Sequence, residues 1–94
     1  MSIHGFIWLE QFVEKLSAKH GVDTTEVEEI FDNHPKIDKV LRGDVPGEDV
    51  YRALGQSYDG RYLIVISIRK RSGQALVVSA RDMDEKERRS YASK

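Results

Sequence analysis

The chain has no cysteine among its 94 residues, and this absence excludes a disulfide framework and a thiolate metal site. Its apolar runs, such as Leu63–Ile66, are far too short to cross a bilayer. Its beginning, MSIHGFIWLEQ, lacks the basic segment followed by a long apolar segment that marks a secretory signal. We therefore expect a soluble, cytoplasmic protein with no membrane partner.

Motifs that carry an enzymatic mechanism of their own are also missing. The sequence has no phosphate-binding loop, no zinc-binding helix pattern and no nucleophile elbow. Its three histidines, His4, His20 and His34, lack the spacing of metal ligands. We therefore predict neither a metal nor a cofactor, and the remaining chemistry is electrostatic.

Charge is segregated along the chain, although its total is only −1. Residues 1–60 carry six Lys/Arg and twelve Asp/Glu, whereas residues 61–94 carry nine Lys/Arg and four Asp/Glu. The basic last third suits a nucleic-acid backbone, and it suits an acidic protein partner equally well. The near-neutral total argues against a general nucleic-acid coat protein.

Length and periodicity predict one domain that begins with two helices. Gly21 ends the first helix. The second helix has Asp23 or Thr24 as its N-cap, and Thr25–Glu28 also has the spacing of a capping box. Pro35 marks the end of the second helix. The first helix is recognised by apolar residues at helical spacing: Leu9, Phe12, Val13 and Leu16.

After Pro35 the pattern becomes that of strands. Gly55 indicates a bulge or a close approach of a neighbour. Asp59-Gly60 and Ser72-Gly73 mark hairpin turns. The composition of residues 43–47 indicates a loop. The expected strands are residues 37–41, 49–58, 62–69 and 75–81, to which residues 6–8 can add a short edge strand.

The two strands at 62–69 and 75–81 are apolar on both faces, which places them centrally in the sheet. Asp84 begins the last helix, with Glu87 at the capping-box position. The predicted fold is therefore α+β: two N-terminal helices, an antiparallel sheet of three to five strands and a short C-terminal helix.

Arg69 and Arg81 are candidates for phosphate binding at the two ends of the last hairpin. If Ser72-Gly73 is a two-residue turn, Arg69 faces Leu76, and Arg81 lies about 15 Å away along the strands. One phosphate cannot contact both arginines, whereas a nucleic-acid backbone can. Solvated charge is the simpler interpretation for Lys70 and Arg71, and the two interpretations are equally supported for Arg81.

Two further groups allow a structural and a functional interpretation. Lys19 and His20 end the first helix, where a cation gains about 0.3–1 kcal/mol from the helix dipole. His20 is also suited to be a general acid or base, because histidine titrates near neutral pH. Arg88 and Tyr91 share a face of the last helix. There the tyrosine can stack on a base or, more often, pack against the sheet.

Taken in order, these segments resemble the BrnT family of toxins from bacterial type II toxin–antitoxin pairs. The resemblance extends from Phe6 to Tyr91. It is carried by FIW, KHGV, EIF, LGQSYDGRYLIVISIR and VVSARDMDEKERRSY, of which the SAR…ERR.Y signature is the most specific.

The resemblance implies a RelE-like fold and a metal-independent ribonuclease that blocks translation and is neutralised by a cognate antitoxin. The catalytic candidates that it implies are Lys19, His20, Arg69 and Arg81. To RNA binding we assign Arg61, Lys70, Arg88 and Tyr91, and Glu87 is a further functional candidate. These residue types suit the reaction, because guanidinium groups bind phosphate oxygens in pairs and histidine can move a proton.

A non-catalytic module is the alternative. In that case the chain is a diverged, toxin-like domain whose basic third binds an antitoxin or a nucleic acid without cleaving anything. Two observations separate the two hypotheses: cleavage of RNA, and toxicity when the chain is expressed without an antitoxin. A neighbouring gene for a small DNA-binding-type partner would favour the toxin.

Overall fold

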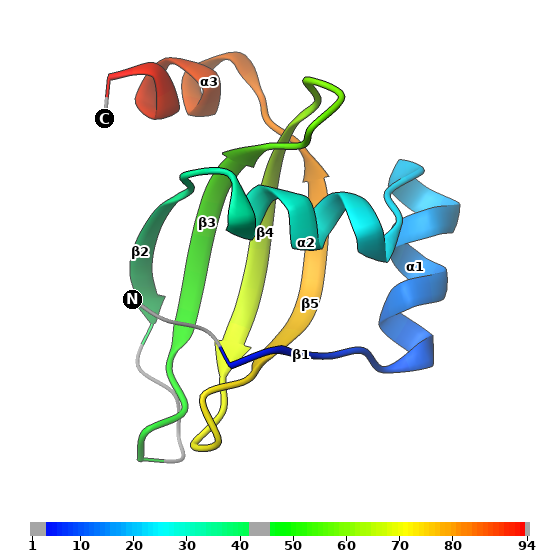
Figure 1. Cartoon of the computed structure of the whole chain (residues 1–94), viewed down its shortest axis with the longest axis vertical. Helices are drawn as coiled ribbons and strands as arrows, with labels where there is room; N and C mark the ends of the chain where they lie inside the picture. The colour runs from blue at the N-terminus through cyan, green and yellow to red at the C-terminus, as the bar shows by residue number, and fades with distance from the viewer. Residues whose placement is uncertain (1–3, 42–45, 94) are drawn as a thin grey trace.

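The computed structural model describes residues 4–41 and 46–93, which form one five-stranded sheet and three helices (Figure 1). The strands lie in the order β1-β5-β4-β3-β2, so β4 is central, as its two apolar faces predict. The elements in chain order are β1 (Phe6–Ile7), α1 (Glu10–His20), α2 (Thr24–Asp32), β2 (Lys36–Leu41), β3 (Val50–Gln56), β4 (Tyr62–Arg69), β5 (Ala75–Asp82) and α3 (Glu85–Ala92).

The sheet is mixed, and the prediction of a purely antiparallel sheet is wrong for its first strand. Strands β2 to β5 pair antiparallel, but β1 runs parallel to the start of β5, with Phe6 opposite Ala75. No hairpin joins β1 to its neighbour, since the chain passes from β1 through both helices to the far edge of the sheet. Its direction was therefore not set by any local turn. The expected edge strand at residues 6–8 exists, and it precedes the helices.

Both N-terminal helices end and begin where short-range signals place them. Gly21 follows α1 with φ 60°, and its N–H donates to Ser17 O at 3.0 Å. The capping box of α2 is Asp23–Glu26, and the predicted spacing Thr25–Glu28 is not used. The reason is that Val22 and Val27, which flank this box, are both buried in the core. They form a hydrophobic staple that starts the helix at Asp23.

The core consists of two clusters on opposite faces of the sheet. Helix α1 stands at the β5 edge and α2 crosses one face (Figure 1). Gly55 allows this packing, because a Cβ atom there would lie 2.9 Å from Ile30 Cβ; the predicted close approach is confirmed. The cluster under α1 and α2 contains Leu16, Val22, Val27, Ile30, Ala53, Leu63, Val65, Val77 and Ala80. The cluster near α3 contains Leu54, Ile64 and Met83, with Tyr62 and Tyr91 packed against it.

The turn between β4 and β5 is one residue longer than predicted. The Lys70 N–H donates to Gln74 O at 2.9 Å, and Arg69 faces Ala75 where a two-residue turn would have set it opposite Leu76. Gly73 has φ 90° and ends a three-residue loop, the arrangement in which a glycine at positive φ forms a bulge. Of the predicted loop at 43–47, residues 43–45 lie outside the described residues, and Pro46 and Gly47 form a turn.

Candidate active site and nucleic-acid interface

The predicted catalytic residues lie at the two ends of the sheet. Lys19 and His20 form the last turn of α1, and Arg81 is the penultimate residue of β5. Arg81 is opposite Ile64, whereas Arg69 ends β4 five residues later. At about 3.3 Å per residue the two arginines are about 16 Å apart along the strand, close to the expected separation. The fold therefore brings Lys19, His20 and Arg81 to one end of the sheet and leaves Arg69 at the other. The Arg81 side chain lies on the face that α3 covers, with Ile64 and Glu87, whereas α1 packs against the cluster on the opposite face.

Arg81 is held at the junction of β5 and α3 by a two-bonded ion pair with Glu87. Its Nη1 donates to Oε1 at 2.8 Å and its Nη2 to Oε2 at 2.9 Å. A further bond runs from Nη1 to Asp82 O at 3.0 Å. These contacts use three of the five guanidinium N–H groups. Among the described residues, nothing accepts from Nε or from the second Nη2 hydrogen, so Arg81 has donors left for a phosphate.

The ion pair also fixes the charge of both groups. The hydrogen bond from Arg81 is the main cause that lowers the pKa of Glu87, and the bond to Glu87 raises the pKa of Arg81. Glu87 is therefore a carboxylate at neutral pH and only accepts hydrogen bonds. Its Oε1 also accepts from the Asp84 N–H at 2.9 Å, which completes the predicted capping box of α3.

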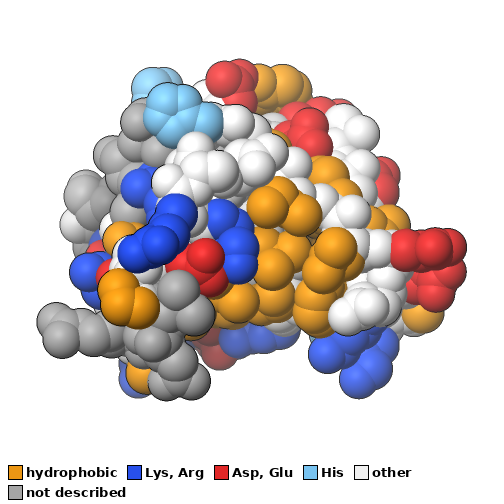
Figure 2. Space-filling model, turned by 90° about the horizontal axis from the view of Figure 1, so that it is seen from below, with side chains coloured by type: hydrophobic (Ala, Val, Ile, Leu, Met, Phe, Trp, Pro, Cys, Tyr) orange, Lys and Arg blue, Asp and Glu red, His pale blue; other side chains and the backbone are white. Residues whose placement is uncertain are grey.

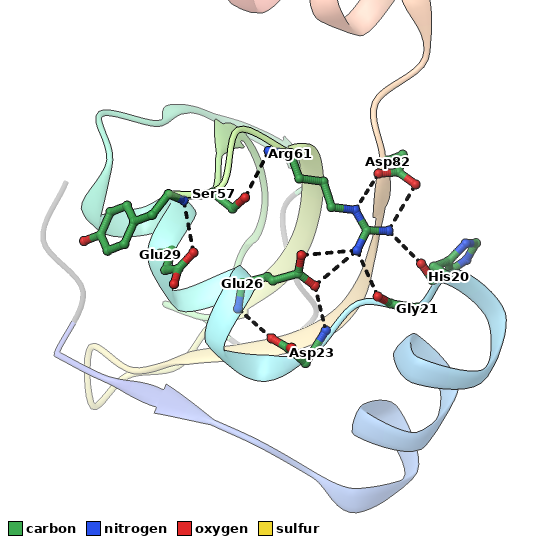
Figure 3. A network of polar contacts seen from close by, with 9 residues as sticks. His20, Gly21, Asp23, Glu26, Glu29, Ser57, Arg61 and Asp82 are labelled. Carbon is green, nitrogen blue, oxygen red and sulfur yellow. Dashed lines mark hydrogen bonds and ion pairs between the residues drawn. The ribbon is translucent and has the colours of Figure 1, made fainter.

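Lys19 and His20 are exposed at the end of α1. Lys19 forms no ion pair with any residue in the described ranges. The His20 ring lies beyond the helix end near Asp82 (Figure 3). A side chain in this position is accessible to a large substrate and adjoins the residue that follows Arg81.

Arg61 lies beside this end of the sheet, with its guanidinium turned into the protein (Figure 3). Nε and Nη2 donate to the two carboxylate oxygens of Asp82 at 2.7 and 3.1 Å. The other acceptors are His20 O at 2.8 Å, Gly21 O at 2.9 Å and the Glu26 carboxylate at 3.1 Å. All five N–H groups are used. RNA binding by Arg61 stays a prediction, but no N–H is left for a phosphate while these contacts hold.

The opposite end of the sheet carries Arg69, Lys70 and Arg71. The Arg69 guanidinium lies 5.7 Å from the Tyr51 ring centroid, and Lys70 forms an ion pair with Glu48 at 2.8 Å. Basic and acidic side chains alternate here beside a hydrophobic patch (Figure 2). An open pocket of about 500 Å³ is lined by His4, Gly47, Asp49, Tyr51, Arg69, Lys70, Arg71 and Gly73.

Arg88 and Tyr91 meet on the ring of Tyr62. The Arg88 guanidinium lies 4.2 Å from the ring centroid, and the Tyr91 ring packs edge-on at 6.1 Å. Tyr91 therefore packs against the sheet, the more common of the two uses considered. Tyr62 was not selected as functional from the sequence; its position at the start of a strand, two residues after the Asp59-Gly60 turn, was the only signal.

Four of the nine cations in the basic third form ion pairs with carboxylates of the described residues. Arg61, Lys70, Arg81 and Arg89 each form an ion pair. Two of the partners, Glu26 and Glu48, come from the acidic first part of the chain. The charges that are segregated in sequence are thus partly neutralised in space. No pattern of sequence spacing identified these acidic partners.

In residues 4–41 and 46–93, no three His, Asp or Glu side chains are grouped so that they could hold a metal ion. None of the helices in the same ranges combines the length and the apolar character needed to span a membrane.

Comparison with known families places this site in context. Residues 8–87 match the sequence model of a family described as "Ribonuclease toxin, BrnT, of type II toxin-antitoxin system". The chain belongs to the BrnT family. The matched range includes all four catalytic candidates and confirms the resemblance inferred from the sequence. Membership of the BrnT family also implies an antitoxin as a partner.

A solved structure agrees with the BrnT fold. The 1.1 Å crystal structure of the Brucella abortus ribonuclease toxin, BrnT, superposes on 89% of this chain and 100% of its own length, with a TM-score of 0.63. The two sequences are 21% identical, so this likeness concerns the fold alone. No curated protein sequence matches the chain.

Proposed function

We propose that this member of the BrnT family is a metal-independent endoribonuclease of the cytoplasm that inhibits translation and is neutralised by a cognate antitoxin. The observation that carries the proposal is the family match over residues 8–87, which includes the Lys19-His20 and Ser79–Arg81 segments. Asp82, which directly follows Arg81, lies near His20 at one end of the sheet, and this supports the proposal. RNA and the antitoxin are the expected partners.

The proposed reaction is an internal transesterification of RNA. The ribose 2′-oxygen attacks the adjacent phosphorus, so that a P–O2′ bond forms and the P–O5′ bond breaks. The products are a 2′,3′-cyclic phosphate and a 5′-hydroxyl. A base must take the 2′-hydroxyl proton, an acid must supply a proton to O5′, and cations must stabilise the charge that builds on the phosphate.

In this scheme His20 moves a proton, and Arg81 and Lys19 stabilise the phosphate. His20 is an exposed imidazole at the end of α1, and Lys19 has no ion pair within the described part of the chain. Arg81 keeps two N–H groups for a phosphate, since Glu87 and Asp82 O accept from the other three. Arg69 and Lys70, at the far end, would bind the RNA backbone away from the scissile phosphate.

Cleavage of RNA by the purified protein in the presence of EDTA tests the proposal. We expect cleavage to persist in the chelator, the products to end in a 2′,3′-cyclic phosphate, and expression without an antitoxin to arrest growth. The His20→Ala variant should lose cleavage, and Arg89→Lys, which alters an exposed pair with Glu85, should retain it. A folded wild-type protein that leaves RNA intact would exclude the ribonuclease.

The non-catalytic module is the second candidate, and the ion pairs of the basic third favour it. Arg61, Lys70 and Arg89 are already paired with carboxylates, which leaves less unpaired charge for an RNA backbone. Binding of RNA or antitoxin without cleavage, together with harmless expression, would support this function.

A further inference from the structure

The side chain of Arg61 joins three segments that are distant in sequence (Figure 3). Its acceptors are the end of α1, the first turn of α2 and the last residue of β5. The Glu26 carboxylate that accepts from it also accepts from the Asp23 N–H in the capping box of α2. One guanidinium is therefore the point at which two helix ends and a strand end meet.

The backbone that carries Arg61 is itself fixed. The Arg61 N–H donates to Ser57 Oγ at 3.0 Å, and the Ser57 N–H donates to Arg61 O at 2.8 Å. Ser57 is only 2% exposed, and Gly60 closes the turn with a bond to Ser57 O. The guanidinium thus extends from a rigid turn, which suits it to hold other segments in place.

Arg61 also contacts the last turn of helix α1. Leu16 is its only fully buried residue in the described structure, and its N-cap Leu9 makes no side-chain capping bond. The carbonyl groups of His20 and Gly21 lie at a helix C-terminus, where intrahelical donors are missing. Arg61 supplies donors to both carbonyls and a positive charge at the negative end of the helix dipole.

The same guanidinium holds the end of β5. Two bonds tie it to Asp82, and the hydrogen bond from Arg61 is the main cause that lowers the pKa of that carboxyl. Asp82 directly follows Arg81, so the Arg81 end of β5 and the His20 end of α1 share one anchor. An ammonium group could not replace it, because lysine lacks the planar fork of five donors.

We propose that Arg61 is a positioning residue of the ribonuclease site, which fixes the His20 end of α1 against the Arg81 end of β5. This inference rests on the proposed function, and it replaces the RNA-binding role expected for Arg61. Arg61 acts through the geometry of the other two residues and does not contact the substrate.

A double-mutant cycle between Arg61 and His20 tests the functional half of the proposal. Arg61→Lys should lower kcat by about 10²-fold, the scale of an effect of about 1 Å in positioning, while KM changes little. In a His20→Ala background the same substitution should cost much less, because one of the two residues that Arg61 positions is gone. Additive losses in the cycle would overturn the proposal.

Amide hydrogen exchange tests the structural half without relying on activity. In Arg61→Lys, the N–H groups of Gly21 and Val22, which donate to Ser17 O and Leu16 O, should exchange faster, while amides of α3 should not change. Equal exchange in wild type and variant would overturn the proposal. If Arg61→Lys does not fold, Asp82→Asn takes its place as the test variant. This substitution weakens the contact between Arg61 and the end of β5. It should speed the exchange of the Gly21 and Val22 amides by less than Arg61→Lys would.

Asn33→Ala is the matched control. Asn33 ties the other end of α2 to β3 through a 2.9 Å bond from its side-chain amide to Gln56 O. Its loss should lower the Tm but leave kcat and the exchange of Gly21 unchanged; a loss of kcat equal to that of Arg61→Lys would count against positioning. If the wild-type protein has no ribonuclease activity, the proposed function fails and this role for Arg61 fails with it. An active wild type with an additive cycle overturns only the role of Arg61.

Discussion

Arg81 and Glu87 bind each other through two parallel hydrogen bonds of 2.8 and 2.9 Å across the junction between β5 and α3. The same carboxylate closes the capping box of α3. Glu87 thus orients Arg81 and also helps to cap the N-terminus of α3. The position of Arg81 in the proposed site therefore depends on where α3 begins.

Replacing Arg81 should affect the rate of RNA cleavage much more than stability. Arg81→Ala should lower kcat by about 10²-fold or more, the usual effect of losing one group that stabilises transition-state charge. Steady-state kinetics on a defined RNA would measure this effect. The Tm should fall only modestly, because the ion pair with Glu87 is lost, and Arg89→Ala on α3 is the control for a lost surface cation. A kcat within twofold of wild type would exclude Arg81 from the reaction.

Neutralising Glu87 should flatten the dependence of stability on pH. The hydrogen bond from Arg81 lowers the pKa of folded Glu87 below the ordinary value of a glutamate, so the stability that the ion pair contributes is fully present above the pKa of the unfolded chain. The contribution is lost as pH falls through the lower, folded pKa. In Glu87→Gln, which keeps a capping-box acceptor, the free energy of unfolding should fall less between about pH 5 and pH 2.

Urea denaturation at several pH values would measure this difference. Glu85→Gln is the control on the same helix, because the Glu85 side chain is 90% exposed. That variant should follow the pH dependence of the wild type. Parallel curves for wild type and Glu87→Gln would show that the ion pair contributes nothing to stability.

RNA binding should depend on salt through the arginines that contact phosphates. Removing Arg81 or Arg69 should each reduce the slope of log K against log salt by about 0.7, the value for one phosphate contact on a single strand. Arg61→Gln should leave the slope unchanged, because all its donors are bound within the protein. Binding titrations from low to high salt would measure the three slopes. A reduced slope for Arg61→Gln would favour a direct RNA contact.

Gly55→Ala should destabilise the fold without touching the site. The added Cβ would lie 2.9 Å from Ile30 Cβ and 3.1 Å from the Ile30 carbonyl oxygen, so α2 must move away from β3. Overpacking of this kind costs about 1–3 kcal/mol. A domain of this size then loses about 4–8 °C of Tm for each kcal/mol. Calorimetry would measure the change, and an unchanged Tm would mean that α2 adjusts freely.

Features that depend on neighbouring residues were predictable from the sequence. Gly21 ends α1 and Asp84–Glu87 begins α3 because a cap needs only residues within one turn. The central position of β4 follows from its two apolar faces. Features that depend on distant partners were not predictable. The parallel pairing of β1 with β5 joins segments about 70 residues apart, and no turn records it.

The sequence by itself determined the family, the α+β class and the chemical types of the site residues, because these depend on local patterns and on the order of motifs. From the sequence, both Arg61 and Arg81 were expected to contact RNA, because two guanidinium groups have the same chemistry. Only the tertiary structure decided which of them has donors left for a substrate. The partners of the Arg61 guanidinium lie 21, 35, 40 and 41 residues away, whereas the Glu87 partner of Arg81 is 6 residues away. Each guanidinium has five N–H donors, and every acceptor that the fold places beside it occupies one of them. Tertiary contacts between distant segments decide which acceptors those are.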